Sequence, residues 1–230
     1  KDLDYSRNSI DEVVNFIDNE LMEVFPLLKE KEEKDRLAVP TKGVALALRA
    51  KLWIYAASPL FNGKYSEAVA LKDHEGRNLF PTEDKTKWNK AVQALEDFIA
   101  YAENGHYELY KVYNSDGSIN AEQSLYELFQ KSLNNKEIIW ASSSSSWGTL
   151  NGEGRERRCT PRDVYQGFAC VGIVQEMIDD FFMKDGLSIT ESPLYSEEGY
   201  DEYYVSNMYK NREPRFYLSV TYQGKPWQII

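Results

Sequence analysis

The fold of this chain is decided by the stretch from Thr41 to Gly63, TKGVALALRAKLWIYAASPLFNG. Alanine and leucine, both strong helix formers, dominate its first part, so a helix is predicted from Thr41 to Ala57. Ser58-Pro59 ends this helix, because the proline ring does not fit into a continuing helical turn. Apolar residues occur on nearly every side of the predicted helix, and we therefore expect it to be buried on several sides.

Two longer helices are predicted around this stretch. A Ser9-x-x-Glu12 capping box opens an amphipathic helix over residues 8–28. The other runs from Trp88 to Ala102, where apolar residues recur at helical spacing. Its small and large residues alternate in a way compatible with tetratricopeptide packing, in which small residues let antiparallel helices approach closely. A strict repeat of about 34 residues is absent, because the connection between the second and third helices is too long.

The rest of the chain is predicted to be less regular. A loop is expected over residues 62–85, a short buried strand over 137–141, and a shorter helix over 120–133. The inner face of that shorter helix is predicted to carry Leu125, Leu128 and Phe129. The fold class is therefore mostly α, with tetratricopeptide-like helical pairs, an irregular loop-rich segment and a few short strands. We divide the chain into a helical part, 1–135, and an irregular, ligand-facing part, 136–230.

Composition and charge exclude several classes of protein. The 230 residues include 42% hydrophobic and 28% charged residues, which is typical of a globular chain that buries a core. The formal net charge of −10 argues against nucleic acid as a partner, because binding to phosphates needs a positive field. No stretch approaches the ~20 uninterrupted apolar residues of a membrane-spanning helix.

No arrangement of residues predicts catalysis or a cofactor. The two histidines, His74 and His106, have neither a histidine four residues away nor a nearby cysteine, so no metal site is predicted. Glycan hydrolysis needs two carboxylates that face each other, and the adjacent Asp179 and Asp180 point in different directions on a predicted helix. A glycoside hydrolase therefore stays an alternative without a predicted site.

Two cysteines, Cys159 and Cys170, leave two interpretations open. They lack the C-x-x-C spacing of a metal site. In an exported protein they could form a disulfide, which would close a loop of ~12 residues and contribute about 3 kcal/mol. Otherwise they are two half-buried thiols.

Five blocks of the sequence, taken in order, resemble the SusD/RagB family of nutrient-binding outer-membrane lipoproteins. The blocks are Thr41–Gly63; Trp88-x-x-Ala91; Asn135–Ala141; Val174–Phe181 with Lys184-Asp185-Gly186; and Tyr209–Tyr217 with Tyr222-x-Gly224 and Trp227. The resemblance covers nearly all of this chain, which corresponds to a middle portion of a complete member. In the last block, Arg212, Glu213 and Arg215 are interpreted as an ion-pair and hydrogen-bond knot that ties a strand to a helix.

The resemblance implies a SusD-like α-α superhelix without catalytic residues, metal or cofactor. It implies a protein of the Gram-negative outer membrane, exposed at the cell surface and lipid-anchored through a segment absent from this chain. The implied partner is a SusC-like TonB-dependent transporter, over which the protein acts as a lid that captures oligosaccharide or polysaccharide nutrients and delivers them. A RagB-like lid for peptides, or a peptide-binding tetratricopeptide scaffold, is the alternative.

The candidate ligand-binding residues lie in the irregular part, between the predicted strand and the helix that begins near Val174. They are Trp147, Arg155, Arg157, Arg158 and Tyr165. Serines and glycines keep this segment exposed, aromatic rings offer faces to sugar C–H groups, and arginine forks pair with hydroxyls. Trp147 has a second interpretation, as a cover of the core.

Replacement of Trp147 and of Tyr165 by alanine separates the two interpretations. Loss of a solvent-facing ring is expected to weaken oligosaccharide binding strongly and to leave the denaturation midpoint unchanged. A Trp147 side chain that covers the core would instead cost about 3–5 kcal/mol of stability when it is replaced by alanine. Affinity and denaturation midpoint are measured on the same variant, and a lowered midpoint without a specific loss of binding would overturn the site.

Overall fold

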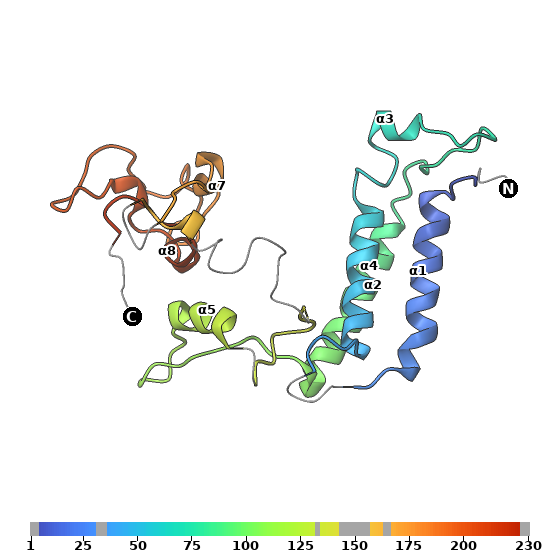
Figure 1. The fold of residues 1–230 in the computed structure, drawn as a ribbon, viewed down its shortest axis with the longest axis horizontal. Helices are drawn as coiled ribbons and strands as arrows, with labels where there is room; N and C mark the ends of the chain where they lie inside the picture. The colour runs from blue at the N-terminus through green and yellow to red at the C-terminus, as the bar shows by residue number, and fades with distance from the viewer. Residues whose placement is uncertain (1–4, 31–35, 132–133, 143–156, 163–166, 226–230) are drawn as a thin grey trace. The chain divides into compact units, whose positions relative to one another are not determined.

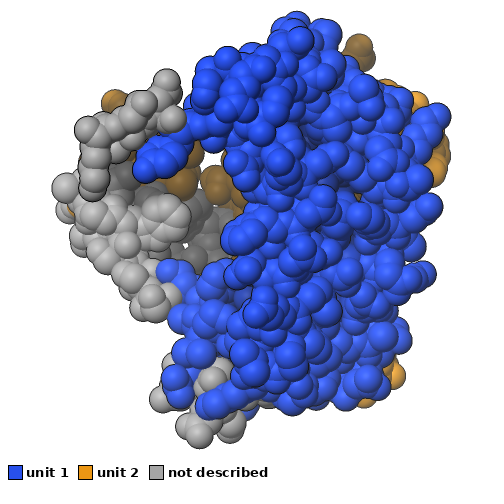
Figure 2. All heavy atoms as spheres, turned by 90° about the vertical axis from the view of Figure 1, so that its right-hand side faces the viewer, with its two compact units in different colours: residues 1–109, 133–143 blue, residues 110–132, 144–230 orange. Residues whose placement is uncertain are grey.

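The computed structural model describes residues 5–30, 36–131, 134–142, 157–162 and 167–225. Contacts divide the chain into two compact units (Figure 2). Unit 1 comprises residues 1–109 and 133–143, and unit 2 comprises residues 110–132 and 144–230. The division into a helical and a ligand-facing part at residue 135 stays a prediction, because the units are defined by contacts and not by role.

Three helices build the core of unit 1: α1 (Ile10–Val24), α2 (Lys42–Ala57) and α4 (Lys87–Tyr101) (Figure 1). They are the helices that the sequence predicts, and α2 packs against both of the others. Their buried side chains form one cluster, which consists of Val14, Ala50, Trp53, Ala56, Ala91 and Ala94. Alanines occupy most of these positions, so α2 and α4 approach closely, as tetratricopeptide-like pairs do.

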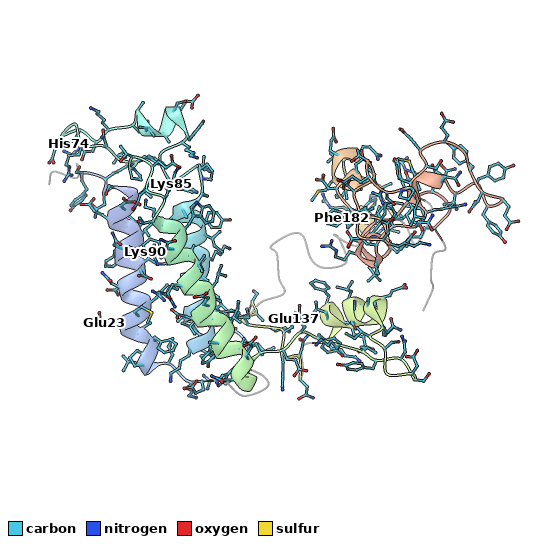
Figure 3. The ribbon with its side chains drawn as sticks, turned by 180° about the vertical axis from the view of Figure 1, so that it is seen from behind. Glu23, His74, Lys85, Lys90, Glu137 and Phe182 are labelled. Carbon is cyan, nitrogen blue, oxygen red and sulfur yellow. The ribbon has the colours of Figure 1, made fainter. Side chains whose placement is uncertain are left out.

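One arginine on α2 joins the three helices. The Arg49 guanidinium donates from Nε to Asp18 on α1, at 2.8 Å, and from Nη1 to Asp97 on α4, at 2.7 Å. Trp53, one turn further along α2, donates its indole N–H to the same Asp18 oxygen at 3.0 Å. Lys90 of α4, labelled in Figure 3, places its ammonium 4.3 Å from the centre of the Trp53 ring. These directional contacts fix the rotation of each helix about its own axis.

Shorter elements complete unit 1. The 3₁₀ turn η1 (Phe25–Leu27) follows α1, and η2 (Ala102–His106) continues α4 up to Gly105, whose φ of 90° ends the helix. The predicted loop over 62–85 contains the helix α3 (Ser66–Val69), which the prediction missed. A helix of this length is too short to leave a periodic pattern in the sequence.

Unit 2 contains shorter helices: α5 (Ala121–Gln130), α7 (Gln175–Asp179), η3 (Asn207–Tyr209) and α8 (Pro214–Ser219). Phe216 of α8 lies at the centre and is fully buried. Aromatic rings surround it at centroid distances between 5.3 and 6.0 Å, and they belong to Phe181, Tyr209, Tyr217 and Tyr222. The core of unit 2 is therefore aromatic, whereas the core of unit 1 is rich in alanine.

The predicted knot around Arg212, Glu213 and Arg215 is present with two changes, because Arg212 makes no ion pair among the described residues and the segment tied to α8 is irregular backbone instead of a strand. Arg215 pairs with Glu213 at 2.6 Å, and the same carboxylate accepts the amide N–H of Phe182 at 3.0 Å. The Arg212 guanidinium is buried and donates to the carbonyl of Ile178, near the carboxyl end of α7, and this hydrogen bond takes the place of the predicted ion pair. The knot therefore ties the segment after α7 to α8.

The predicted strand over 137–141 is wrong. Turn and irregular backbone occupy these residues, and pairing elsewhere in the described ranges consists of isolated bridges such as Met183 with Arg212. The segment is held by a neighbouring loop instead of a sheet. The amide of Ala141 donates to the Leu37 carbonyl at 3.1 Å, and the indole N–H of Trp140 donates to the carbonyl of Ala38 at 2.9 Å.

The inner face predicted for the shorter helix is wrong at Phe129, which is 84% exposed on α5. The buried residue of this helix is Ser124, whose hydroxyl accepts the amide N–H of Val112 at 2.8 Å. Because main chain approaches this face of α5, only a small side chain fits there. The mostly helical fold class itself is confirmed.

Gly43 offers a test of how closely the first turn of α2 is packed. A Cβ at this position would lie 2.1 Å from the hydroxyl oxygen of Tyr107, whose ring also stacks on Phe98 at 5.8 Å. Gly43→Ala is therefore expected to destabilise the protein by about 1–3 kcal/mol, the usual cost of overpacking. In a Tyr107→Ala background the same change should be neutral or stabilise by up to about 1 kcal/mol, because alanine is the better helix former. Chemical denaturation of the four proteins measures both effects, and an equal cost in both backgrounds would contradict the packing argument.

Candidate functional site

The predicted site residues fall into two groups. Trp147, Arg155 and Tyr165 lie outside the described residues, so their roles stay predictions. Arg157 and Arg158 lie in a short helical turn, and the Arg157 guanidinium lies 4.8 Å from the centre of the Phe168 ring. One predicted arginine is therefore in contact with an aromatic ring, Phe168, that was not among the predicted site residues.

The turn that carries these arginines runs beside a second segment of unit 2. The amide of Phe168 donates to the Arg157 carbonyl at 2.7 Å, and the amide of Cys170 donates to the Arg158 carbonyl at 3.0 Å. Ala169 bonds in the same way to the carbonyl of Thr160, at 3.0 Å. Backbone hydrogen bonds therefore bring Cys159 and Cys170 onto neighbouring segments.

Both cysteines are free thiols with exposed side chains. The disulfide interpretation is not realised in this structure, although the two segments are neighbours. The half-buried interpretation is wrong as well, because the loops around these residues leave both side chains open to solvent.

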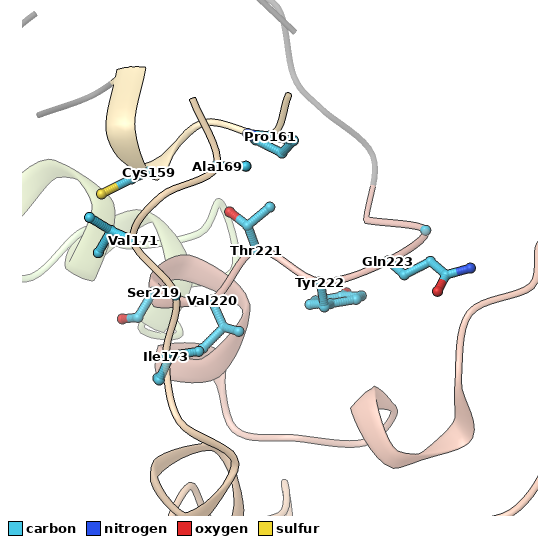
Figure 4. A pocket seen from close by; sticks show the side chains of 12 residues that line it. Cys159, Pro161, Ala169, Val171, Ile173, Ser219, Val220, Thr221, Tyr222 and Gln223 are labelled. Atoms are coloured by element: carbon cyan, nitrogen blue, oxygen red, sulfur yellow. The ribbon is translucent and has the colours of Figure 1, made fainter. Parts of the chain in front are cut away.

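A cavity of about 660 Å³ opens beside this turn (Figure 4). Three segments of unit 2 line it, and the lining residues are Cys159, Pro161, Ala169, Val171, Gly172, Ile173, Ser219, Val220, Thr221, Tyr222, Gln223 and Gly224. Its volume falls within the range of small-molecule sites, which is roughly 300–1,000 Å³. The turn with the predicted arginines therefore forms one edge of this cavity.

The lining of the cavity is uncharged. Aliphatic side chains come from the 169–173 segment, and hydroxyl and amide groups come from Ser219, Thr221, Tyr222 and Gln223. Among the described residues, the lining contains no carboxylate, imidazole, ammonium or guanidinium group. Such a mixture offers apolar surface and neutral hydrogen-bonding groups together, which suits a neutral ligand with both C–H faces and hydroxyls.

Tyr222 is held in place by the aromatic core. Its ring lies 4.8 Å from the Tyr209 ring and 5.4 Å from the Phe216 ring, measured between centroids. Burial raises the pKa of its phenol further above neutral pH, and the protonated hydroxyl is both a donor and an acceptor. Lys225 donates to the Val220 carbonyl at 2.9 Å and fixes the chain just after this residue.

Sequence reasoning missed most of this cavity. Tyr222 and Gly224 were noted only as part of a family block. The residues of the 169–173 wall show only a short apolar run, which does not predict a binding site. The glycine at 224 has a φ of 83°, and a Cβ there would lie 2.4 Å from the side chain of Val205. This close approach is the physical reason for a glycine after Tyr222, and it is visible only in the fold.

No group of three histidine, cysteine, aspartate or glutamate side chains in the described ranges is placed to hold a metal ion. His74 and His106 each lie near a glutamate, at 3.9 and 3.8 Å. Within the same ranges, no helix is long and apolar enough to cross a membrane.

These features define a class of protein with two kinds of unit: one of closely packed helices, and one with a cavity whose described lining residues are uncharged and lie mostly in loops. The model of the SusD family matches residues 136–229, a range that contains every segment lining the cavity. The resemblance to the SusD/RagB family predicted from the five blocks is thereby confirmed.

Solved structures share the fold. BT4246 in a selenomethionine form aligns with a TM-score of 0.69 and 22% identity, over 92% of this chain and 42% of its own length. A second structure of BT4246 gives a TM-score of 0.67 and 22% identity, over 92% and 41%. The SusD-like protein BF3747 from Bacteroides fragilis NCTC 9343 gives 0.61 and 19% identity, over 94% and 35%. A comparison with curated proteins gives no match.

The two thiols provide a test of the loops around the cavity. Because Cys159 and Cys170 are free and exposed, two thiols are expected to react in the native protein without denaturant or reductant. A chromogenic disulfide reagent counts them, and the Cys170→Ser variant should show one. Thiols that become reactive only after reduction would instead establish the disulfide.

Proposed function

We propose that this chain is part of a SusD-type nutrient-binding protein and that it binds neutral oligosaccharides in the cavity of unit 2. The main support for the proposal is that the range matched by the family model contains all the described lining residues of the cavity. Residues 136–229 match the SusD family, and the cavity is built from residues 159–224.

The chemistry of the lining favours a sugar over other nutrients. Pyranose rings present C–H faces to apolar and aromatic side chains and hydroxyls to neutral donors and acceptors, and the cavity offers both. Thr221 and Tyr222 supply hydroxyls next to the aliphatic wall of Val171 and Ile173. The net charge of −10 disfavours acidic glycans but does not oppose neutral ones.

The other functions considered are less well supported. A peptide-binding RagB-like lid or tetratricopeptide scaffold agrees with the helices of unit 1, but the described lining residues include no charged group to fix a peptide terminus or a charged side chain. A glycoside hydrolase needs two carboxylates across its cleft, and neither Asp179 nor Asp180 lines the cavity. The absence of catalysis stays a prediction.

The rest of the proposal follows from family resemblance. A SusD-type protein is exposed on the outer membrane of a Gram-negative cell and anchored by lipid. It closes as a lid over a SusC-like TonB-dependent transporter and delivers the captured glycan to it. Neither a metal nor a cofactor takes part in this role.

Calorimetry with neutral oligosaccharides and with a mixture of short peptides tests the class of ligand. Binding of an oligosaccharide without change in its chain length, followed by chromatography, is the expected result. Binding of peptides alone would favour the RagB-like alternative. Cleavage products at catalytic amounts of protein would establish a hydrolase.

A variant and a chemical probe locate the ligand. Thr221→Val removes one hydroxyl and keeps the shape of the side chain, so it should weaken binding of the oligosaccharide by about 2- to 10-fold, the value of one hydrogen bond. Thr82→Val, an exposed threonine of unit 1, should leave binding unchanged and serves as the control.

Bound sugar should also slow alkylation of Cys159, which lines the cavity, and leave the rate at Cys170, which does not, unchanged. Equal rates with and without sugar at both thiols would place the ligand elsewhere.

A further inference from the structure

Three tyrosines near the end of one hairpin of unit 2 are far more exposed than is usual for such rings. Tyr200, Tyr203 and Tyr204 are 67%, 73% and 74% exposed. They belong to residues 199–206, which we call the tyrosine tip, and which lie in a loop that extends outward in orange and red in Figure 1. A soluble surface rarely gathers large rings in this way unless they meet a ligand or partner.

The tyrosine tip is held rigidly by the side chain of Asp201. One oxygen of its carboxylate accepts the amide N–H groups of Tyr203 and Val205, each at 2.9 Å. The other oxygen pairs with Lys210 at 3.3 Å. The amide of Asp201 donates to the Val205 carbonyl, and the amide of Tyr204 donates to the Asp201 carbonyl, both at 3.0 Å. A loop tied by this many bonds presents its rings with little loss of conformational freedom on binding.

The backbone at Tyr204 is strained. Its φ is 59°, a left-handed conformation that an aromatic residue seldom adopts. Glycine or asparagine would satisfy this geometry without strain, so the presence of a tyrosine has no conformational explanation. Strain of this kind persists where the side chain serves a purpose other than folding.

The tyrosine tip adjoins the candidate cavity. Val205, at its base, packs so closely on Gly224 that a Cβ at Gly224 would meet the valine at 2.4 Å. Gly224 is itself one of the residues that line the cavity. A ligand too long for the cavity therefore has the tyrosine tip within reach on this side, inside the same compact unit.

The negative charges near the tyrosine rings favour a neutral ligand over an anionic one. Glu197, Glu198 and Glu202 surround the tyrosines in the sequence and are exposed. A negatively charged polymer would be repelled from such a surface, whereas the C–H faces of neutral sugar rings stack on tyrosine and their hydroxyls bond to the phenols and carboxylates.

We propose that the tyrosine tip binds the sugar units of a neutral oligosaccharide that project from the cavity, so that this protein prefers long chains to short ones. The inference rests on the proposed function of the cavity and adds the length of the substrate to it. Asp201 is a positioning residue in this arrangement, and the tyrosines make the contacts.

Calorimetry with neutral gluco-, xylo-, manno- and galacto-oligosaccharides of two and six units tests the proposal. The wild-type chain should bind the six-unit form of its sugar at least about tenfold more tightly than the two-unit form. Tyr203→Ser combined with Tyr204→Asn should remove most of this difference and leave the affinity for the two-unit form unchanged. Asparagine is chosen at position 204 because it tolerates the left-handed backbone.

Tyr113→Ser is the matched control, because Tyr113 is 58% exposed and sits at the closing bridge of another hairpin in unit 2. It should keep the full preference for six units. Asp201→Ala should lose the preference as the tyrosine variant does, with circular dichroism confirming that the fold is intact.

These measurements distinguish a wrong role for the tyrosine tip from a wrong role for the cavity. Equal affinity for both lengths, or a preference that survives in the tyrosine variant, would overturn the role of the tyrosine tip and leave the cavity standing. No binding of any sugar at either length would overturn both. Loss of the preference in the Tyr113 control as well would show that exposed tyrosines act without regard to position, and it would overturn the assignment to this hairpin.

Discussion

The close contact between α2 and α4 is the constraint on which unit 1 depends. Alanines at the crossing bring the two backbones together, and Arg49 then reaches from α2 to carboxylates on both flanking helices. A larger residue at Ala91 or Ala94 would push the helices apart and break those charge-assisted bonds at the same time. Packing and electrostatics therefore favour the same arrangement, which is the condition for a single well-defined scaffold.

Unit 2 is stabilised by an aromatic core and a buried arginine instead of by closely packed long helices. It has short helices and isolated bridges in the described ranges, so regular hydrogen bonding supplies little of its order. Phe216 and the rings around it supply the apolar core, and the buried Arg212 guanidinium joins the end of α7 to that core. The cavity wall at Tyr222 is part of the same aromatic cluster, so the core fixes this wall of the site, whereas loop residues supply much of the remaining lining.

The sequence predicted what depends on local pattern and missed what depends on distant packing. The three long helices of unit 1, α1, α2 and α4, were predicted correctly, because their sequences show a clear periodicity together with a capping box on α1 and a proline stop after α2. Residues 137–141 have the composition of a strand, but no partner strand is present in the described ranges, and a loop holds them. Phe129 was placed inward by its spacing alone, but the face of α5 that packs inward is centred on Ser124, which bonds to the Val112 main chain, and Phe129 points to solvent. The cavity joins residues about fifty positions apart, which no short pattern encodes.

A lining without charged groups among its described residues suits the release of ligand that the proposed role requires. A nutrient carrier has to release its ligand to a transporter, and buried ion pairs would slow that release because breaking one leaves an unpaired charge in a dry site. Hydroxyls, an amide and aromatic faces bind through many weak contacts that can be exchanged one at a time for water. Rings spread between the cavity and the tyrosine tip would add affinity through the number of sugar units bound rather than through the strength of any single contact, as multivalent binding does. Long chains would then be retained while they are collected, and each sugar unit would still leave its contact readily.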